Sequence, residues 1–112
     1  MERIFIEAYS IRKRNDVIHE LERKITDNGG WIMDHQMFSN KSISLWVVTS
    51  RVKLEQMFTD LKMIDLNMNS DRLNSILLAF QSNGNLENII LSLTINFIND
   101  YSDLKVKVPT ST

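Results

Sequence analysis

Apolar and polar residues alternate along positions 31–50, and this alternation predicts two antiparallel strands that meet at a short turn. A strand directs successive side chains to opposite faces of its sheet, so every second residue shares a face. A three-residue turn at Ser39-Asn40-Lys41 brings the more apolar positions of both arms onto one face, whereas an even-numbered turn does not. The residues expected on that face are Trp31, Met33, His35, Met37, Ile43, Leu45 and Val47.

The segments before this hairpin predict one strand and one helix. Residues 3–10 alternate in the same way and are expected to form the first strand. Apolar residues spaced three and four apart predict a helix over 16–28. Asn15 is expected to cap its N-terminus, and Gly29-Gly30 to end it, because glycine readily takes the left-handed conformation that closes a helix.

Five further elements are expected after the hairpin, on the same two periodicities. They are a helix over 51–61, capped by Thr49 or Ser50; a strand over 63–69; a helix capped by Ser70 and ended by Asn83-Gly84; a strand over 88–99; and a short edge strand over 104–108.

The first six elements follow the order βαββαβ, which is typical of a ferredoxin-like antiparallel sheet with both helices on one side. We therefore expect an α+β fold in which such a sheet is extended by a third helix and one or two C-terminal strands. The whole chain, 1–112, is expected to be a single domain, with the ferredoxin-like core in 1–69 and the αβ extension in 70–112.

Composition limits the classes of function. The net charge is −1 and the isoelectric point is about 6.1, so no strong field attracts nucleic acid or an anionic membrane. The chain has no cysteine, which excludes disulfides, thiolate zinc sites and thiol catalysis. No apolar run approaches the ~20 residues of a membrane span, and the N-terminus lacks the apolar region of a signal peptide. We expect a cytoplasmic protein without a membrane partner.

No motif for catalysis, metal binding or cofactor binding is present in the sequence. The two histidines, His19 and His35, have no legible partner for acid–base chemistry. Asp34 and His35 are adjacent on a strand and so point to opposite faces, which makes them a poor metal chelate. There is no glycine-rich phosphate loop and no nucleophile elbow. We expect no enzyme activity, no metal and no cofactor.

Nucleic-acid binding is an alternative, because RNA-recognition domains share the βαββαβ order and stack bases on aromatic residues of the central strands. Phe5, Tyr9 and Trp46 occupy outward positions of this kind. The segment around Trp46 lacks the basic, glycine-aromatic pattern of those domains, however, and Glu7 lies amid the aromatic residues. With a net charge of −1 as well, no nucleic-acid partner is expected.

The outward side of the sheet is the candidate functional surface. If the first and third strands are central neighbours, Phe5, Tyr9, Trp46 and Val48 meet there, and such a face is seldom left to water. Either the third helix covers it, burying its apolar stripe, or another protein does. The stripe consists of Leu73, Ile76, Leu77 and Phe80. The second alternative predicts a non-catalytic binding protein, either a regulatory homodimer or a small inhibitor of the immunity-protein type.

In element order, the first sixty-odd residues resemble ACT-type regulatory domains, through a strand over 4–9, a helix over 16–28, a hairpin over 31–49 and a helix over 51–61. ACT-type domains bind amino acids or pair with one another. The resemblance implies an alternative function, a sensor for a small metabolite at the start of the first helix. Free N–H groups there can receive a carboxylate. The ligand-binding residues of this alternative are Ser10, Arg12, Arg14 and Asn15.

Overall fold

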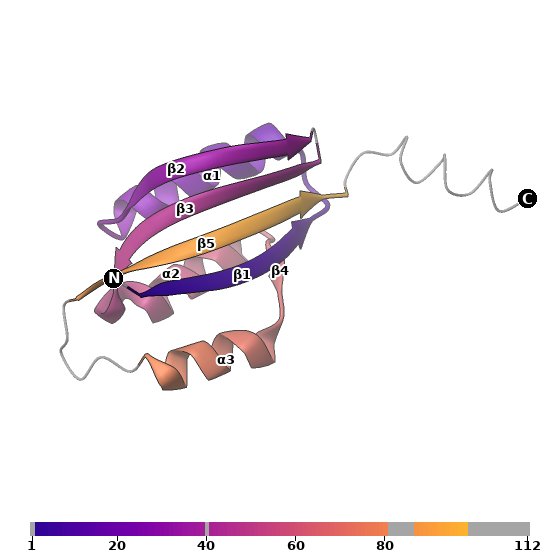
Figure 1. Cartoon of the computed structure of the whole chain (residues 1–112). Helices are drawn as coiled ribbons and strands as arrows, with labels where there is room; N and C mark the ends of the chain where they lie inside the picture. Colours follow the sequence, from indigo (N-terminus) through magenta and orange to yellow (C-terminus); the bar gives the residue numbers. More distant parts are fainter. Residues whose placement is uncertain (1, 40, 81–86, 99–112) are drawn as a thin grey trace, which may run out of the picture.

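The computed structural model describes residues 2–39, 41–80 and 87–98 of the chain. Within these residues one five-stranded sheet is combined with three α-helices, so the expected α+β class is confirmed (Figure 1). In chain order the elements are β1 (Arg3–Ser10), α1 (Arg14–Asp27), β2 (Trp31–Ser39), β3 (Ser42–Ser50), the 3-10 turn η1 (Arg51–Lys53), α2 (Leu54–Met63), β4 (Asn67–Met68), α3 (Ser70–Ala79) and β5 (Asn88–Phe97).

The strands lie in the order β2-β3-β5-β1-β4, which places β5 at the centre of the sheet. β5 runs parallel to β1 and antiparallel to β3, and it pairs with each along their full length. The sequence prediction made β1 and β3 neighbours in an antiparallel sheet, and this strand order corrects it. The central place suits β5, because its inward residues Leu91, Leu93 and Ile95 each expose 0% of their surface. A strand between two others buries the most apolar area.

The hairpin β2–β3 has the predicted register at its turn end and a different register at its other end. Met37 pairs with Ile43, which is the pairing that a three-residue turn predicts. In the structure a register shift between Met37 and Ser39 produces this pairing. A second shift at Met33 inserts one extra residue into β2, and Trp31 therefore lies opposite Val48. The prediction that Trp31 and Met33 share the inward face is wrong, because a bulge of this kind reverses the alternation beyond it.

The end of α1 fixes how β2 enters the sheet. Gly29 has φ +76°, and the N–H of Gly30 donates to the carbonyl oxygen of Ile25 at 2.9 Å. This is a Schellman-type end, which satisfies carbonyl groups left free in the last turn. A Cβ on Gly30 would lie 2.6 Å from the carbonyl oxygen of Val48, so β2 starts where only glycine fits. At its other end α1 begins at Arg14, so the expected N-cap role of Asn15 is wrong.

The segment after α2 contains less strand than predicted. Met63 is the last residue of α2, and only Asn67 and Met68 form a strand, β4. The reason is a turn at Asp65, whose φ of 64° is incompatible with an extended chain. The next helix is capped by Asn69, whose side-chain oxygen accepts the N–H of Arg72 at 2.9 Å, and not by Ser70. The predicted helix end at 83–84 and edge strand at 104–108 lie outside the described residues.

The first turn after β3 also differs from the prediction. The chain enters α2 through η1, and neither Thr49 nor Ser50 caps it: Ser50 precedes η1 without a side-chain hydrogen bond, and Thr49 is a buried residue of β3. The helix predicted over 51–61 is otherwise present as η1 and α2.

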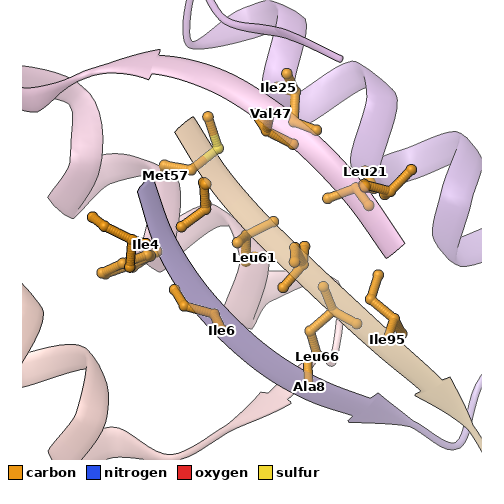
Figure 2. Packing of buried hydrophobic residues seen from close by; sticks show 14 of the residues in the cluster. Ile4, Ile6, Ala8, Leu21, Ile25, Val47, Met57, Leu61, Leu66 and Ile95 are labelled. Atoms are coloured by element: carbon orange, nitrogen blue, oxygen red, sulfur yellow. The ribbon is translucent and has the colours of Figure 1, made fainter. Parts of the chain in front are cut away.

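One apolar core lies between the sheet and the helices. α1 and α2 lie behind the sheet in Figure 1, and Figure 2 shows their side chains together with those of β1, β3 and β5. The helical part of this core consists of Val17, Leu21, Ile25, Leu54, Met57, Phe58, Leu61, Leu73 and Ile76. None of the helices in the described part of the chain is long and apolar enough to cross a membrane.

α3 lies beside the β1 edge of the sheet and does not cover the opposite face (Figure 1). Its buried residues Leu73 and Ile76 join the same core as α1 and α2. Arg72 donates from its guanidinium to the carbonyl oxygen of Phe5 at 3.1 Å, beyond the short reach of β4 along β1. The alternative in which the third helix buries the outward aromatic residues is therefore wrong, because the Phe5 side chain is 63% exposed.

Candidate protein-binding face of the sheet

The candidate site is the sheet face turned away from α1 and α2, here called the outer face. Among the described residues no helix lies across it, because the buried apolar residues of all three helices belong to the core on the other side. α3 reaches only the β1 edge of this face, where Asn69 and Arg72 line a pocket with Phe5, Glu7, Ser92 and Thr94. The strand pairings define its members. They are Arg3, Phe5, Glu7 and Tyr9 of β1; Asn88, Ile90, Ser92, Thr94 and Asn96 of β5; Ser42, Ser44, Trp46, Val48 and Ser50 of β3; and Trp31, Asp34 and Gln36 of β2.

The strand order decides which of the predicted interface residues meet. Phe5 and Trp46 lie in one cross-strand row, but Ser92 of β5 stands between them. Val48 lies in the next row, opposite Trp31, and exposes only 2% of its surface. Val48 therefore packs against its neighbours and has almost no exposed surface that a partner could contact. The exposed apolar part of this end of the face belongs to Phe5 at 63% and Trp31 at 52%.

Tyr9 lies apart from the other predicted interface residues. It is four positions beyond Phe5 along β1, opposite Asn96, and it is 49% exposed. Polar residues of β5 and β3 fill the region between, where the hydroxyl groups of Ser44 and Thr94 are hydrogen bonded at 2.7 Å. The outer face thus has an aromatic end and a polar middle, and Tyr9 belongs to the far end of that polar region.

Two members of the aromatic end were missed by the sequence prediction. Trp31 was assigned to the inward face by strict alternation, and the bulge at Met33 carries no signal of its own in the sequence. Ile90 was not considered because its neighbours depend on where β5 enters the sheet. The alternation within residues 88–97 does place Ile90 on the face opposite the buried residues of this strand. This is the one feature of the sequence that could have identified Ile90 as a member of the outer face.

Charged side chains surround the aromatic end. The Arg3 guanidinium carbon lies 5.8 Å from the centroid of the Trp46 ring, within the range of a cation–π contact. Glu7 lies on the other side of Phe5 along the same strand, and Asp34 lies opposite Trp46. The outer face therefore carries both signs of charge close to its aromatic residues.

Ser92 is a nearly buried polar residue in the middle of the outer face. It exposes 5% of its surface, and its Oγ has no hydrogen-bond partner within the described residues. A buried hydroxyl without a partner costs roughly 1–3 kcal/mol relative to one that is satisfied. Ser92 is therefore a weak point of the isolated fold, placed between the side chains of Phe5 and Trp46.

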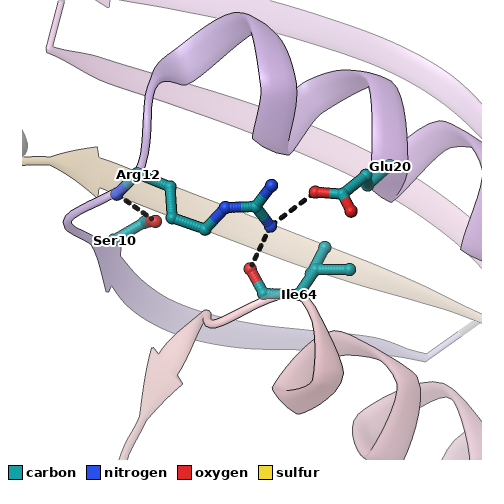
Figure 3. Close-up of polar contacts among 4 residues, drawn as sticks. All are labelled: Ser10, Arg12, Glu20 and Ile64. Carbon is teal, nitrogen blue, oxygen red and sulfur yellow. Dashed lines mark hydrogen bonds and ion pairs between the residues drawn. The ribbon is translucent and has the colours of Figure 1, made fainter.

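The residues of the alternative metabolite site lie at the start of α1 and are largely engaged within the chain (Figure 3). The Ser10 hydroxyl accepts the backbone N–H of Arg12 at 3.1 Å. The Arg12 guanidinium donates to the carbonyl oxygen of Ile64 at 3.2 Å and forms an ion pair with Glu20. Together these contacts fasten the start of α1 to the end of α2.

The other two residues of the alternative site, Arg14 and Asn15, occupy the first positions of α1. Arg14 contacts the Met37 sulfur at 3.6 Å, and Asn15 is exposed. The two histidines, His19 and His35, are exposed on different elements. In the described part of the chain no group of three or more His, Asp or Glu side chains is arranged to hold a metal ion.

Comparison with known proteins finds no match to a family model, to a curated protein or to a solved structure. The resemblance to ACT-type domains therefore stays a prediction.

Proposed function

We propose that this chain is a small non-catalytic binding protein that acts through the outer face. The observation that carries the proposal is the exposure of Phe5 and Trp31, at 63% and 52%, beside Trp46 on a sheet face that no described helix covers. Aromatic residues are favoured anchors of protein interfaces. The bound protein is either a second copy, as in a regulatory homodimer, or an enzyme that this chain inhibits as immunity proteins do.

The backbone under the aromatic end supports an interface. Phe5, Trp46 and Ile90 belong to β1, β3 and β5, and the last two strands are paired on both sides over most of their length. Strands held in this way do not have to be ordered on binding, so an anchor on them loses little entropy. A partner would therefore meet a surface whose shape is already set.

The free edge of β2 is a less suitable binding surface than the outer face. A sheet edge can recruit another strand through its unpaired N–H and C=O groups. In β2, however, two register shifts interrupt the strand, one between Ile32 and Asp34 and one between Met37 and Ser39. Bulges twist an edge away from regular pairing and are a known means of blocking strand addition. This favours the face of the sheet over its edge.

We also propose that the fold is an elaborated ferredoxin-like unit. If β5 is left out, the remaining order is β2-β3-β1-β4, with β4 antiparallel to β1 and β2 antiparallel to β3. This is the order of a split βαβ pair, into which β5 is inserted between β3 and β1. The insertion widens the sheet, and it is β5 that places Ser92 between the two aromatic residues of the outer face.

Site-specific photo-crosslinking tests the proposed function. A benzophenone side chain is placed at Phe5 or, as a matched control, at Met63 of α2, which is 66% exposed on the other side of the sheet. In the cells that produce the protein, we expect covalent adducts with protein at Phe5 and few at Met63. Trp31→Ala should reduce the adducts at Phe5 without unfolding the chain. Equal adducts at both positions, or none at Phe5, would contradict the proposal.

A further inference from the structure

We infer that the protein bound at the outer face is a second copy of this chain, packed face to face about a twofold axis beside Phe5. The inference rests on the proposed function and specifies its partner. It is carried by the way charge is distributed along β1.

Arg3, Phe5 and Glu7 are successive outward residues of β1, so a cation and an anion lie on either side of the most exposed ring of the strand. Alternate residues of a strand are about 6.6 Å apart. The twofold axis lies in the plane between the two sheets, perpendicular to β1, and passes beside Phe5. Rotation about this axis places β1 of one copy over β1 of the other with the strand direction reversed. It places Arg3 of each copy opposite Glu7 of the other, with the two Phe5 rings between the charge pairs. Such an interface is isologous and therefore closes as a dimer.

The other rows of the outer face also match under this operation. Ile90 comes to lie over Thr94, and Trp31 over Gln36. Each apolar side chain thereby faces a smaller polar one, which lets two sheet faces interdigitate at the usual spacing of about 10 Å. The arrangement is a pair of sheets of the kind found in β-sandwiches.

The charge of the outer face favours a second copy over a strongly charged partner. The described strands contribute Arg3, Glu7 and Asp34 to it, and Arg72 of α3 lies at its β1 edge, so both signs of charge are present. A basic or acidic partner would neutralise only one sign and leave the other without a counter-charge. A second copy pairs Arg3 with Glu7 twice. Asp34 lies in the row of the axis, on the edge strand β2, and so faces Asp34 of the other copy at the rim of the contact.

The contact is modest in size, because it involves the outward residues of four strands. Stable interfaces bury about 800 Å² on each partner. Association is therefore to be measured over a wide range of protein concentration, by analytical ultracentrifugation at low and at physiological salt.

Charge reversal tests the inference with the full chain. Arg3→Glu and Glu7→Arg should each weaken self-association by about tenfold or more, because each places like charges opposite one another twice. An equimolar mixture of the two variants should associate again to within about threefold of the wild type, since each unlike pair is restored in the mixed dimer. Lys53→Glu, at an exposed position of η1, is the control and should leave association unchanged.

A wild type that stays monomeric, a dimer that neither charge reversal weakens, or a mixture that does not recover would each overturn the inference. These failures are distinguishable from failure of the proposed function. Crosslinks from Phe5 to a different protein, with a monomeric wild type, would reject the second copy and leave the outer face as a binding surface. Loss of Phe5 crosslinks to any protein would reject both.

Discussion

Two adjacent residues of the central strand β5 are expected to respond differently to replacement by alanine. Leu93 points into the core, exposes 0% of its surface and lies between Ile6 and Leu45 on the neighbouring strands. Leu93→Ala removes apolar atoms and leaves a cavity among strands that cannot close on it. The expected loss in the free energy of unfolding is about 2–5 kcal/mol.

Ser92 points to the outer face, and its hydroxyl has no hydrogen-bond partner among the residues that the structure describes. Ser92→Ala removes that hydroxyl, keeps the Cβ and relieves part of a desolvation cost of roughly 1–3 kcal/mol. We expect the free energy of unfolding to stay the same or to rise by up to about 1 kcal/mol.

Urea unfolding followed by tryptophan fluorescence measures both effects, at protein concentrations below those at which copies associate. The two variants should share one slope with the wild type and differ in midpoint. Equal losses for Leu93→Ala and Ser92→Ala would show that the Ser92 hydroxyl makes a stabilising hydrogen bond. An unchanged midpoint for Leu93→Ala would show that Leu93 does not fill the core, and either result would contradict the expected difference between the two sides of β5.

Three further predictions concern how the helices are held. Gly30→Ala should cost about 1–3 kcal/mol of stability, measured by urea unfolding, because its Cβ would meet the carbonyl oxygen of Val48 at 2.6 Å; an unchanged midpoint would contradict this. Asn69→Ala should cost about 1 kcal/mol and Ser70→Ala less than about 0.5, since Asn69 carries the capping oxygen of α3; the reverse order would assign the cap to Ser70. Arg12→Met should cost about 1 kcal/mol, because it loses the hydrogen bond to the Ile64 carbonyl oxygen at the end of α2 and the ion pair with Glu20 of α1; an unchanged midpoint would contradict this. A thermal-shift screen with amino acids, run on Arg12→Met and on the wild type, also tests the metabolite alternative. That alternative requires an amino acid to stabilise the wild type and to stabilise Arg12→Met less or not at all.

The elements of this fold were largely predictable, because each depends on a local period. The strand predicted over 3–10 is β1 to the residue, and the strand predicted over 88–99 contains β5. Alternation assigns the buried side of a strand whichever strand lies next to it. For that reason the buried residues of β5 were predicted correctly, whereas the strands on either side of it were not.

The strand order and the outer face were predictable only in part. Insertion of β5 between β1 and β3 depends on contacts far apart in sequence, and these leave no local pattern. Two errors at the site followed from this and from the bulge at Met33: Val48 was expected to be open to a partner, and Trp31 was expected to lie inside. Phe5 was placed correctly, since β1 is a regular strand throughout.

Sedimentation equilibrium of three proteins, the wild type, Phe5→Ser and Met63→Ser, tests most directly whether the outer face binds a second copy. Phe5 and Met63 are exposed to nearly the same extent, 63% and 66%, but they lie on opposite sides of the sheet. We expect the wild type and Met63→Ser to associate equally and Phe5→Ser to associate at least about tenfold more weakly. A Phe5→Ser variant that associates as the wild type does, or a wild type that sediments as a monomer at every concentration, would contradict this.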